Sequence, residues 1–574
     1  MDGTGQRSIQ KFISGCFNFI VQCMKTLLLK ISIVKTKLVG GSNESVNQCI
    51  QDLTRTFSGN KIYLMYYDEI DIHCIHILVE VLEKNTTITT LAFGFNRINE
   101  QCLHILIESL KKNTTLTKLN LLHQINNQSA CALADVLKMN TVLTKLDLGS
   151  KQIDYQGVHA LADALKMNTV LRTLKLYDNR IDNREVYTLV DALKINTTLK
   201  NLYLGYNQIS NHGAQVLADS LKINTSLTKF NLEYNRIGDQ GVQALAESLK
   251  INTTLATFSL RSNHIGDQSA QILAEALKIN TSLTILDLGF NQIGDEGAQA
   301  LAEALKTNTI LMTLDLAFNQ ISRQGAQFLA EALKINTSLT ILYLAFSQID
   351  NHGTLALAEA LKINTALVTL DLQDNQISDQ GTQALAEALK INTALATLDL
   401  QDNQISDQGT LALTEALKIN TTLSTLYLSN NQISDQGTHA LAEALKINTA
   451  LATLDLSNNQ ISDQGTQVLA EALKINTTLV SLDLSNNQIS DQGAQALVET
   501  FKINTTLITL YLHNGIINDE YAHALTKALQ INATNKKRLR CLQILCLKKL
   551  KQLNRINEIK SFNPNIYESC MMKY

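Results

Sequence analysis

The chain of 574 residues contains no tryptophan and a single proline, Pro564. Hydrophobic residues nevertheless make up 45% of it, with leucine, alanine and isoleucine at regular intervals. A proline inside a strand or helix removes a backbone donor and interrupts regular structure. The near absence of proline therefore favours an uninterrupted stack of short, regular elements.

Cysteine is missing from the whole middle of the chain: none of the nine lies between Cys131 and Cys541. An odd number of cysteines with no paired framework is typical of a reducing compartment. We therefore expect a cytoplasmic location.

The net charge of −3 hides an uneven distribution. Residues 1–59 carry 7 Lys or Arg against 3 Asp or Glu, and residues 535–574 carry 10 against 2. Subtracting these two ends from the total leaves −15 for residues 60–534. An acidic middle with basic ends argues against nucleic acid bound along its length.

One stretch of 28 residues recurs through most of the chain, and residues 451–478 show it most clearly: LATLDLSNNQISDQGTQVLAEALKINTT. Its 16 copies begin at residues 88, 116, 143, 171, 199, 227, 255, 283, 311, 339, 367, 395, 423, 451, 479 and 507. Every step is 28 residues except the 27 from 116 to 143. A fixed period of this length predicts a solenoid of stacked units.

Each unit combines two hydrophobic patterns. Leu454 and Leu456 are two residues apart, so an extended strand places them on one face. Asn459 follows the strand, where its amide can bond main-chain groups of its own and neighbouring units. Residues 462–465 offer helix-capping oxygens and a flexible glycine. Apolar residues at helical spacing over 468–473 complete the unit, so we predict an α/β solenoid whose inner side is a parallel sheet and whose outer side is helical.

The pattern L-x-x-L-x-L-x-x-N-x-I followed by L-A-E-A-L resembles the leucine-rich repeats of the ribonuclease-inhibitor type. It is most similar to the repeat region of CARD-containing proteins of the NOD-like receptor family. The resemblance spans residues 88–534. It implies a leucine-rich repeat horseshoe and a role in binding.

The two ends differ from the repeats. We predict a non-repeat, helical N-terminal segment over 1–59, the solenoid over 60–534, and a basic capping segment or tail over 535–574. Residues 60–87 match the helix half of a unit, but their strand half, around residues 63–68, fits poorly. A signal or membrane segment at residues 12–34 and a membrane-surface or partner-binding basic helix after residue 535 are the less favoured alternatives.

Motifs of catalysis are missing. The chain has no G-x-x-x-x-G-K-[ST], G-x-S-x-G or H-E-x-x-H, and His73, Cys74 and His76 have no convergent partners. We therefore expect no enzyme activity, no cofactor and no metal. An alternative is a GTPase regulator, because residues 293–302 resemble the repeats of Ran GTPase-activating proteins. A second alternative is a sensing fragment of an innate-immunity receptor that lacks its nucleotide-binding module.

Counted from the first residue of a unit, positions three, five and seven should face outward on the concave side. Early units place Lys118, Lys145, Lys175, Lys229 and Arg261 there, and later ones place Asp287, Asp315, Asp371, Asp399, Asp455 and Asp483. This split would steer a charged partner, whereas drift among solvated residues would explain it equally well. We expect a monomer that binds a protein on this face.

Position eight is the other candidate. It is aromatic in five units (Tyr206, Tyr234, Phe290, Phe318 and Phe346) and Asp or Asn in the units from 367 to 489. Contiguous rings at a water-facing edge often mark a partner site. The alternative is a ladder of rings that pack on one another as part of the architecture.

Overall fold

The computed structural model describes residues 57–58, 60–64, 70, 72–94, 98–122, 126–149, 153–513 and 517–534. The chain divides into two units, residues 1–292 and residues 293–574. The signal or membrane alternative for residues 12–34, the N-terminal segment up to residue 56 and the basic segment after residue 534 lie outside the described residues.

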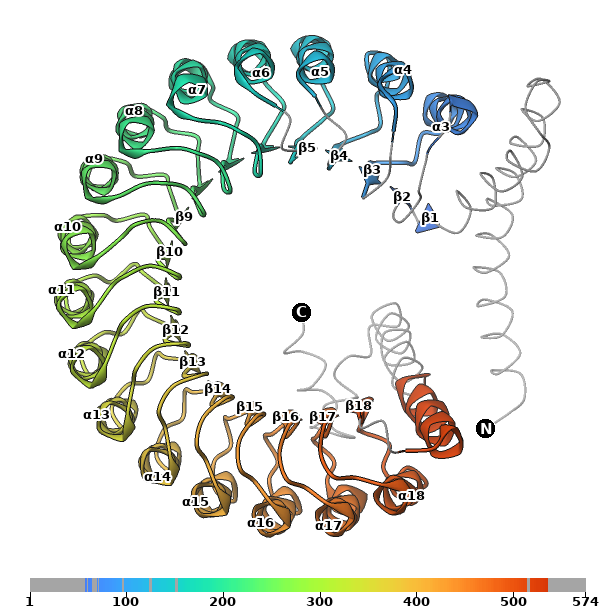
Figure 1. Ribbon diagram of the computed structural model, residues 1–574, viewed down its shortest axis with the longest axis vertical. Helices are drawn as coiled ribbons and strands as arrows, with labels where there is room; N and C mark the ends of the chain where they lie inside the picture. The colour runs from blue at the N-terminus through green and yellow to red at the C-terminus, as the bar shows by residue number, and fades with distance from the viewer. Residues whose placement is uncertain are drawn as a thin grey trace, which may run out of the picture. The chain divides into compact units, whose positions relative to one another are not determined.

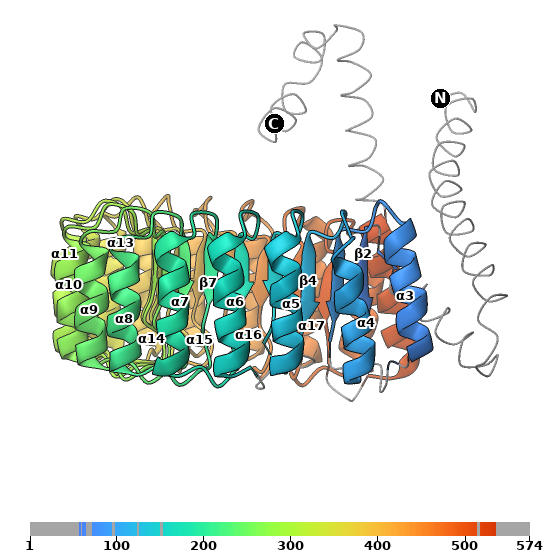
Figure 2. The ribbon, with the colours of Figure 1, turned by 90° about the horizontal axis from the view of Figure 1, so that it is seen from above.

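Unit 1 alternates strands and helices (Figures 1 and 2). Its strands are β1 (Phe57–Ser58), β2 (Lys61–Leu64), β3 (Thr90–Phe93), β4 (Lys118–Leu121), β5 (Lys145–Asp147), β6 (Thr173–Lys175), β7 (Asn201–Tyr203), β8 (Lys229–Asn231), β9 (Thr257–Ser259) and β10 (Ile285–Asp287). Its helices are α3 (Ile72–Lys84), α4 (Glu100–Leu110), α5 (Asn127–Met139), α6 (Tyr155–Met167), α7 (Asn183–Ile195), α8 (Asn211–Leu221), α9 (Asp239–Leu249) and α10 (Asp267–Leu277). β1 pairs antiparallel with β2, and β2 to β10 pair in sequence order as parallel neighbours.

Unit 2 repeats the alternation. Its helices are α11 (Asp295–Leu305), α12 (Arg323–Leu333), α13 (Asn351–Leu361), α14 (Asp379–Leu389), α15 (Asp407–Leu417), α16 (Asp435–Leu445), α17 (Asp463–Ile475) and α18 (Asp491–Thr500). Its strands are β11 (Thr313–Asp315), β12 (Ile341–Tyr343), β13 (Thr369–Asp371), β14 (Thr397–Asp399), β15 (Thr425–Tyr427), β16 (Thr453–Asp455), β17 (Ser481–Asp483) and β18 (Thr509–Tyr511), all parallel to their neighbours. Residues 519–534 form a further helix.

In each unit the strands lie on the inner, concave side and the helices on the outer side (Figure 1). The prediction of an α/β solenoid with a parallel inner sheet and a 28-residue repeat is therefore confirmed. The strand half of residues 60–87 does form, as β2, and pairs parallel with β3.

The core lies between the sheet and the helices. Leu454, Leu456, Ile461 and Leu469 are at most 1% exposed, and their equivalents in the repeats that begin at residues 143 to 479 are buried alike. Burying one such side chain stabilises by roughly 1.5–3 kcal/mol. A single repeat buries these side chains only between its neighbours, so the stack supplies the stability that one repeat lacks.

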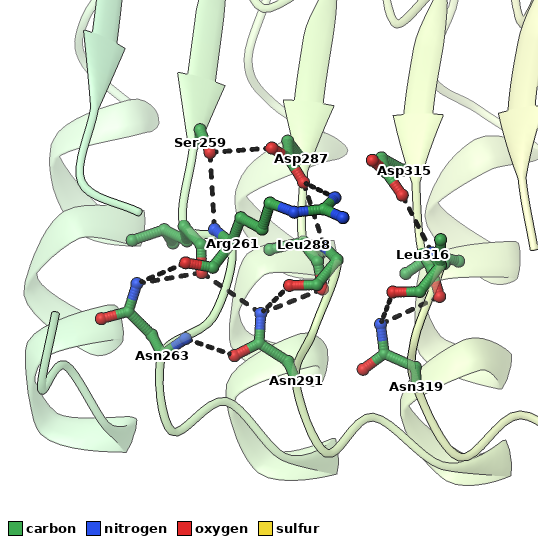
Figure 3. Close-up of polar contacts among 12 residues, drawn as sticks. Ser259, Arg261, Asn263, Asp287, Leu288, Asn291, Asp315, Leu316 and Asn319 are labelled. Atoms are coloured by element: carbon green, nitrogen blue, oxygen red, sulfur yellow. Dashed lines mark hydrogen bonds and ion pairs between the residues drawn. The ribbon is translucent and has the colours of Figure 1, made fainter. Parts of the chain in front are cut away.

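Buried asparagines connect the repeats at the end of each strand. The side-chain N–H of Asn459 donates to Leu456 O of its own repeat at 3.1 Å and to Leu428 O of the preceding repeat at 3.0 Å. Its Oδ1 accepts from the backbone N–H of Ile433 at 3.0 Å. The predicted role of Asn459 is confirmed, and Figure 3 shows the same pattern at Asn263 and Asn291.

A second set of asparagines connects the repeats where the helices end. Asn476 is 4% exposed and donates to Leu445 O of the preceding repeat at 2.7 Å, while its Oδ1 accepts from the backbone N–H of Thr478 and Leu479. Asn196, Asn252 and Asn420 occupy the same position in other repeats and are buried as well.

The helix start confirms one part of the prediction and corrects the other. Ser462 caps α17, because its hydroxyl oxygen accepts from the backbone N–H of Gln464 at 3.2 Å. Gly465 lies inside α17, and a Cβ built on it would be 2.5 Å from Oδ1 of Asp435 in the preceding repeat. That Oδ1 accepts from the backbone N–H of Ser462 at 2.8 Å and of Gly465 at 3.0 Å. Close packing between repeats, rather than turn flexibility, therefore favours a small residue here, and Ser269 occupies the same position in another repeat.

Candidate functional site

Basic side chains in unit 1 lie among tyrosines on the strand face. Lys175 Nζ is 3.1 Å from a carboxylate oxygen of the buried Asp147, and 5.5 and 5.3 Å from the ring centres of Tyr177 and Tyr203. Lys229 Nζ is 5.4 Å from the same Tyr203 ring. At such distances a cation is attracted to the ring face. Lys175 and Lys229 therefore share one aromatic neighbour on this face.

Burial perturbs these groups. It lowers the pKa of Lys145, with the charge of Lys175 as a second cause. It also raises the pKa of Tyr177 to about 12, and the nearby carboxylate of Asp147 acts in the same direction. Both shifts reflect side chains partly removed from water before any partner has bound.

Arg261 and Asp287 form the last charged group of unit 1 (Figure 3). The Arg261 guanidinium is 3.5 Å from Asp287 Oδ1 and 4.4 Å from the ring centre of Phe290. Ser259 donates to Asp287 Oδ2 at 2.9 Å. The predicted site residues Arg261, Asp287 and Phe290 are thus in one cluster.

Unit 2 carries acidic and aromatic side chains at position five of its strands. In strand order these are Asp315, Tyr343, Asp371, Asp399, Tyr427, Asp455, Asp483 and Tyr511. We call the five aspartates among them the carboxylate row. Each accepts a backbone N–H two residues later, as Asp315 does from Ala317 at 2.9 Å, so each also has a local structural role.

The carboxylate row is poorly solvated. Burial raises the pKa of Asp371 and of Asp455, and it raises that of Asp399 to about 6, with the charge of Asp371 adding to the effect. Asp371 and Asp399 are register partners on adjacent strands. Burial and the neighbouring carboxylates also raise the pKa of Tyr343 and Tyr427. Such a surface favours positive charge.

Position eight has an unusual backbone. Its φ is between 46° and 58° in twelve successive repeats, from Asp178 to Asn486. Asparagine and aspartate tolerate this left-handed region, whereas a bulky side chain there is a clear outlier. The five rings Tyr206, Tyr234, Phe290, Phe318 and Phe346 all occupy it.

The five rings are partly stacked and partly open to solvent. Tyr206 and Tyr234 lie face to face with ring centres 4.1 Å apart, and Phe318 and Phe346 do so at 3.9 Å. Tyr206 is 46% exposed, and the other four are half-buried. Burial, together with hydrogen bonding to Tyr234, raises the pKa of Tyr206 to about 12. Four of the five rings thus form two stacked pairs.

Sequence reasoning missed the tyrosines of the strand face. Tyr203, Tyr343 and Tyr427 stand at position five, the position that identified the aspartates, and Tyr177 stands at position seven. Comparing the same position across all units would have found them. The left-handed backbone had a signal too, because Asn and Asp fill position eight of the later units.

Cys74 is disulfide-bonded, whereas Cys102 and Cys131 form no disulfide. Across the described residues, no group of three or more His, Cys, Asp or Glu could hold a metal ion. No helix in the described part of the chain is long and apolar enough to cross a membrane.

The sequence of the chain matches a family model that is described as Leucine Rich repeat. The matched residues are 196–218, 224–246, 252–274, 280–302, 307–330, 364–386, 392–413, 420–442, 448–470 and 476–498. The class of the protein is therefore an α/β solenoid of stacked repeats, and the chain is a leucine-rich repeat protein.

Two solved structures illustrate the likeness. One is the actin-binding site 2 of leiomodin-1, 25% identical, covering 29% of this chain and 95% of that chain with a TM-score of 0.26. The other is an internalin from Listeria monocytogenes, 22% identical, covering 70% of this chain and 87% of that chain with a TM-score of 0.36. A comparison with curated proteins finds no match.

Proposed function

We propose that the protein is a non-catalytic scaffold that binds a protein partner on the concave strand face. Leucines bury the core side of each strand, and the buried asparagines hydrogen-bond its end. The outward side chains therefore project from a rigid sheet. A preorganised surface loses little conformational freedom on binding. Polar, charged and aromatic groups alternate on it, which suits recognition of another protein.

The five rings carry this proposal. A left-handed backbone costs a residue with a Cβ roughly 1–2 kcal/mol. A stacked pair recovers about 0.5–1.5 kcal/mol. Folding alone therefore gains little from Tyr206 or Phe318 compared with the Asn458 found at the same position later. Rings that are partly open to solvent and have no net stabilising role are what a binding hot spot uses.

The strand face and the helix face can be tested against each other. Partners captured by the chain from cell extract would be identified, and their affinity measured for Tyr203→Ser and Lys229→Ser on the strand face. Gln243→Ser and Gln271→Ser on exposed helix positions are matched controls. We expect at least tenfold weaker binding for the first pair only. Loss for the helix pair alone would contradict the proposal.

We also propose that the repeats are of the ribonuclease-inhibitor type and similar to those of NOD-like receptors. The same proposal includes a monomeric state and a cytoplasmic location. Cys102 and Cys131, which form no disulfide, support that location, and the disulfide of Cys74 argues against it. Thiol labelling of the protein in intact cells tests it. Accelerated GTP hydrolysis by a small GTPase in its presence would instead favour the GTPase-regulator alternative.

A further inference from the structure

The strand face of unit 2 carries negative charge without compensation from its own strands. Positions one to eight of its eight repeats contain seven aspartates and no lysine or arginine. The aspartates are the carboxylate row together with Asp374 and Asp402. The lysines that pair in this unit do so on the helices, as Lys446 does with Glu443 and Lys390 with Glu387. The strand face of unit 2 is therefore an anionic sheet surface whose own strands supply no lysine or arginine.

The carboxylates are held in fixed directions. One oxygen each of Asp371 and Asp399 accepts a backbone N–H at 3.0 Å, and those of Asp455 and Asp483 do so at 2.8 Å. The pairs Asp371–Asp399 and Asp455–Asp483 are register partners, so like charges stand side by side at the strand spacing of about 4.8 Å. Cations placed across the strands would relieve this repulsion.

Tyrosines separate the carboxylate pairs. Tyr343 stands between Asp315 and Asp371, and Tyr427 between Asp399 and Asp455. Both rings are half-buried. Ring faces beside carboxylates accept the alkyl stems of lysine and the planar guanidinium of arginine. The occupant that fits is a segment rich in lysine and arginine.

We propose that residues 535–574 of this same chain occupy the strand face of unit 2. This segment holds 10 Lys or Arg against 2 Asp or Glu, which complements the seven aspartates of the face. Seven of the ten lie within residues 536–551, in the runs KKRLR and KKLK. The charge of the segment and that of the face are nearly equal and opposite.

The segment begins next to the face. Asn532, at the end of the last described helix, donates to Leu507 O at 2.9 Å and to Asn504 O at 3.0 Å. Leu507 opens the repeat that contains β18, the last strand of the face. Eight strands at about 4.8 Å span roughly 34 Å, and an extended chain covers about 3.3 Å per residue. The 40 residues from 535 to 574 therefore reach the whole row.

Attachment makes this contact effective. A short tether gives the tethered segment an effective concentration in the millimolar range, so weak ion pairs suffice. The segment would then shield the anionic face from basic proteins until a competitor or high salt displaces it. This self-contact does not depend on the identity of the partner or on the role of the five rings.

Zero-length cross-linking of the full chain tests the contact. A carbodiimide joins a carboxylate to a lysine only when the two touch, and peptide mass spectrometry then locates the link. We expect links from lysines 536, 537, 548, 549 and 551 to the carboxylate row, weakened at least fivefold in 1 M salt. The helix pairs Lys446–Glu443 and Lys390–Glu387 are internal controls for the reaction. Links of these lysines only to helix-face carboxylates would overturn the proposal.

Mixing heavy and light isotope-labelled chains distinguishes a contact within one chain from a contact between two copies. Links within one isotope population support the self-contact, and links only between populations would show that a second copy sits there. As a second readout, a full chain with the five lysines changed to glutamine should bind a synthetic 535–551 peptide at least tenfold more tightly than the wild type does. Equal affinity of the two chains would contradict an occupied face.

Discussion

The side-chain N–H of Asn403 donates a hydrogen bond of 3.0 Å to the carbonyl oxygen of Leu372, which belongs to the preceding repeat. The same amide donates to Leu400 O at 3.2 Å, and its Oδ1 accepts from Ile377 N at 3.1 Å. Asn403 is 7% exposed. One buried side chain thus joins two repeats by hydrogen bonds that water cannot replace.

Replacing this asparagine should be costly. Asn403→Ala leaves buried backbone groups of Leu372 and Ile377 without these partners, and we expect a loss of about 2–3 kcal/mol in unfolding free energy. Gln404→Ala, at the exposed neighbouring position, should change it by less than about 0.5 kcal/mol. Chemical denaturation of both variants is the measurement. Similar stability of the two variants would show that the buried asparagines do not stabilise the stack of repeats.

Ser347 occupies the position of this asparagine in its own repeat, and its buried hydroxyl has no hydrogen-bond partner. Ser347→Asn supplies the amide found at Asn375 in the next repeat, which donates to Leu344 O at 3.0 Å. We expect a gain of about 1–2 kcal/mol in unfolding free energy. Ser347→Ala removes the unpaired hydroxyl but supplies no donor, so its gain should be smaller. Equal stability of the two variants would show that the added amide contributes nothing.

The pKa of Asp399, raised to about 6, has a consequence for stability. Between the unfolded value near 4 and about 6 the folded chain binds this proton more tightly, so the contribution of Asp399 to stability falls as pH rises through that window. Asp399→Asn should therefore stabilise by about 1–3 kcal/mol at pH 8 and by almost nothing at pH 4. Unfolding curves at both pH values check this. A gain that is the same at both would mean that charge is not the cause.

Gly437 tests the packing of the helix starts. A Cβ there would be 2.5 Å from Asp407 Oδ1, which accepts the N–H of Gly437 at 2.9 Å, and 2.9 Å from Ile433 Cγ2. Gly437→Ala should destabilise by about 1–3 kcal/mol, although alanine favours helices over glycine.

Gly266→Ser is the matched control for that substitution. Gly266 is an N-cap with an extended backbone and no capping side chain, and its nearest contact is at 4.0 Å. Serine there should be neutral or stabilising by a few tenths of a kcal/mol. Thermal unfolding of Gly437→Ala and Gly266→Ser shows whether steric contact between repeats or helix propensity has the larger effect on stability.

Much of the fold could be predicted because the spacing of residues within one repeat indicates its strand and its helix. Leu454 and Leu456 are two residues apart, and this alone indicates a strand with one buried face. The role of Asn459 followed from the need to satisfy strand-end carbonyls. The inter-repeat hydrogen bonds of Asn476 and Asp435 were missed, because their partners lie 27 to 31 residues away and become neighbours only when the repeats stack.

The candidate site was less accessible to sequence reasoning. The five rings stood out by comparison of one position across repeats. Their face-to-face pairing needed coordinates, whereas Asn and Asp at position eight of the later repeats were a sequence signal of the left-handed backbone. Both features bear on the choice between architecture and binding. Ion pairs such as Lys175–Asp147 also required the register of adjacent strands.

The affinity of a captured partner for ring-to-asparagine variants tests the central claim most directly. Tyr206→Asn with Tyr234→Asn, and Phe318→Asn with Phe346→Asn, install the residue that the later repeats carry at this backbone position. Because asparagine relieves the left-handed strain while the stack is lost, unfolding free energies should stay within about 1 kcal/mol of wild type. The account predicts at least tenfold weaker binding with this stability retained. Unchanged affinity, or unfolding with normal affinity in the folded fraction, would contradict it and make the rings part of the architecture.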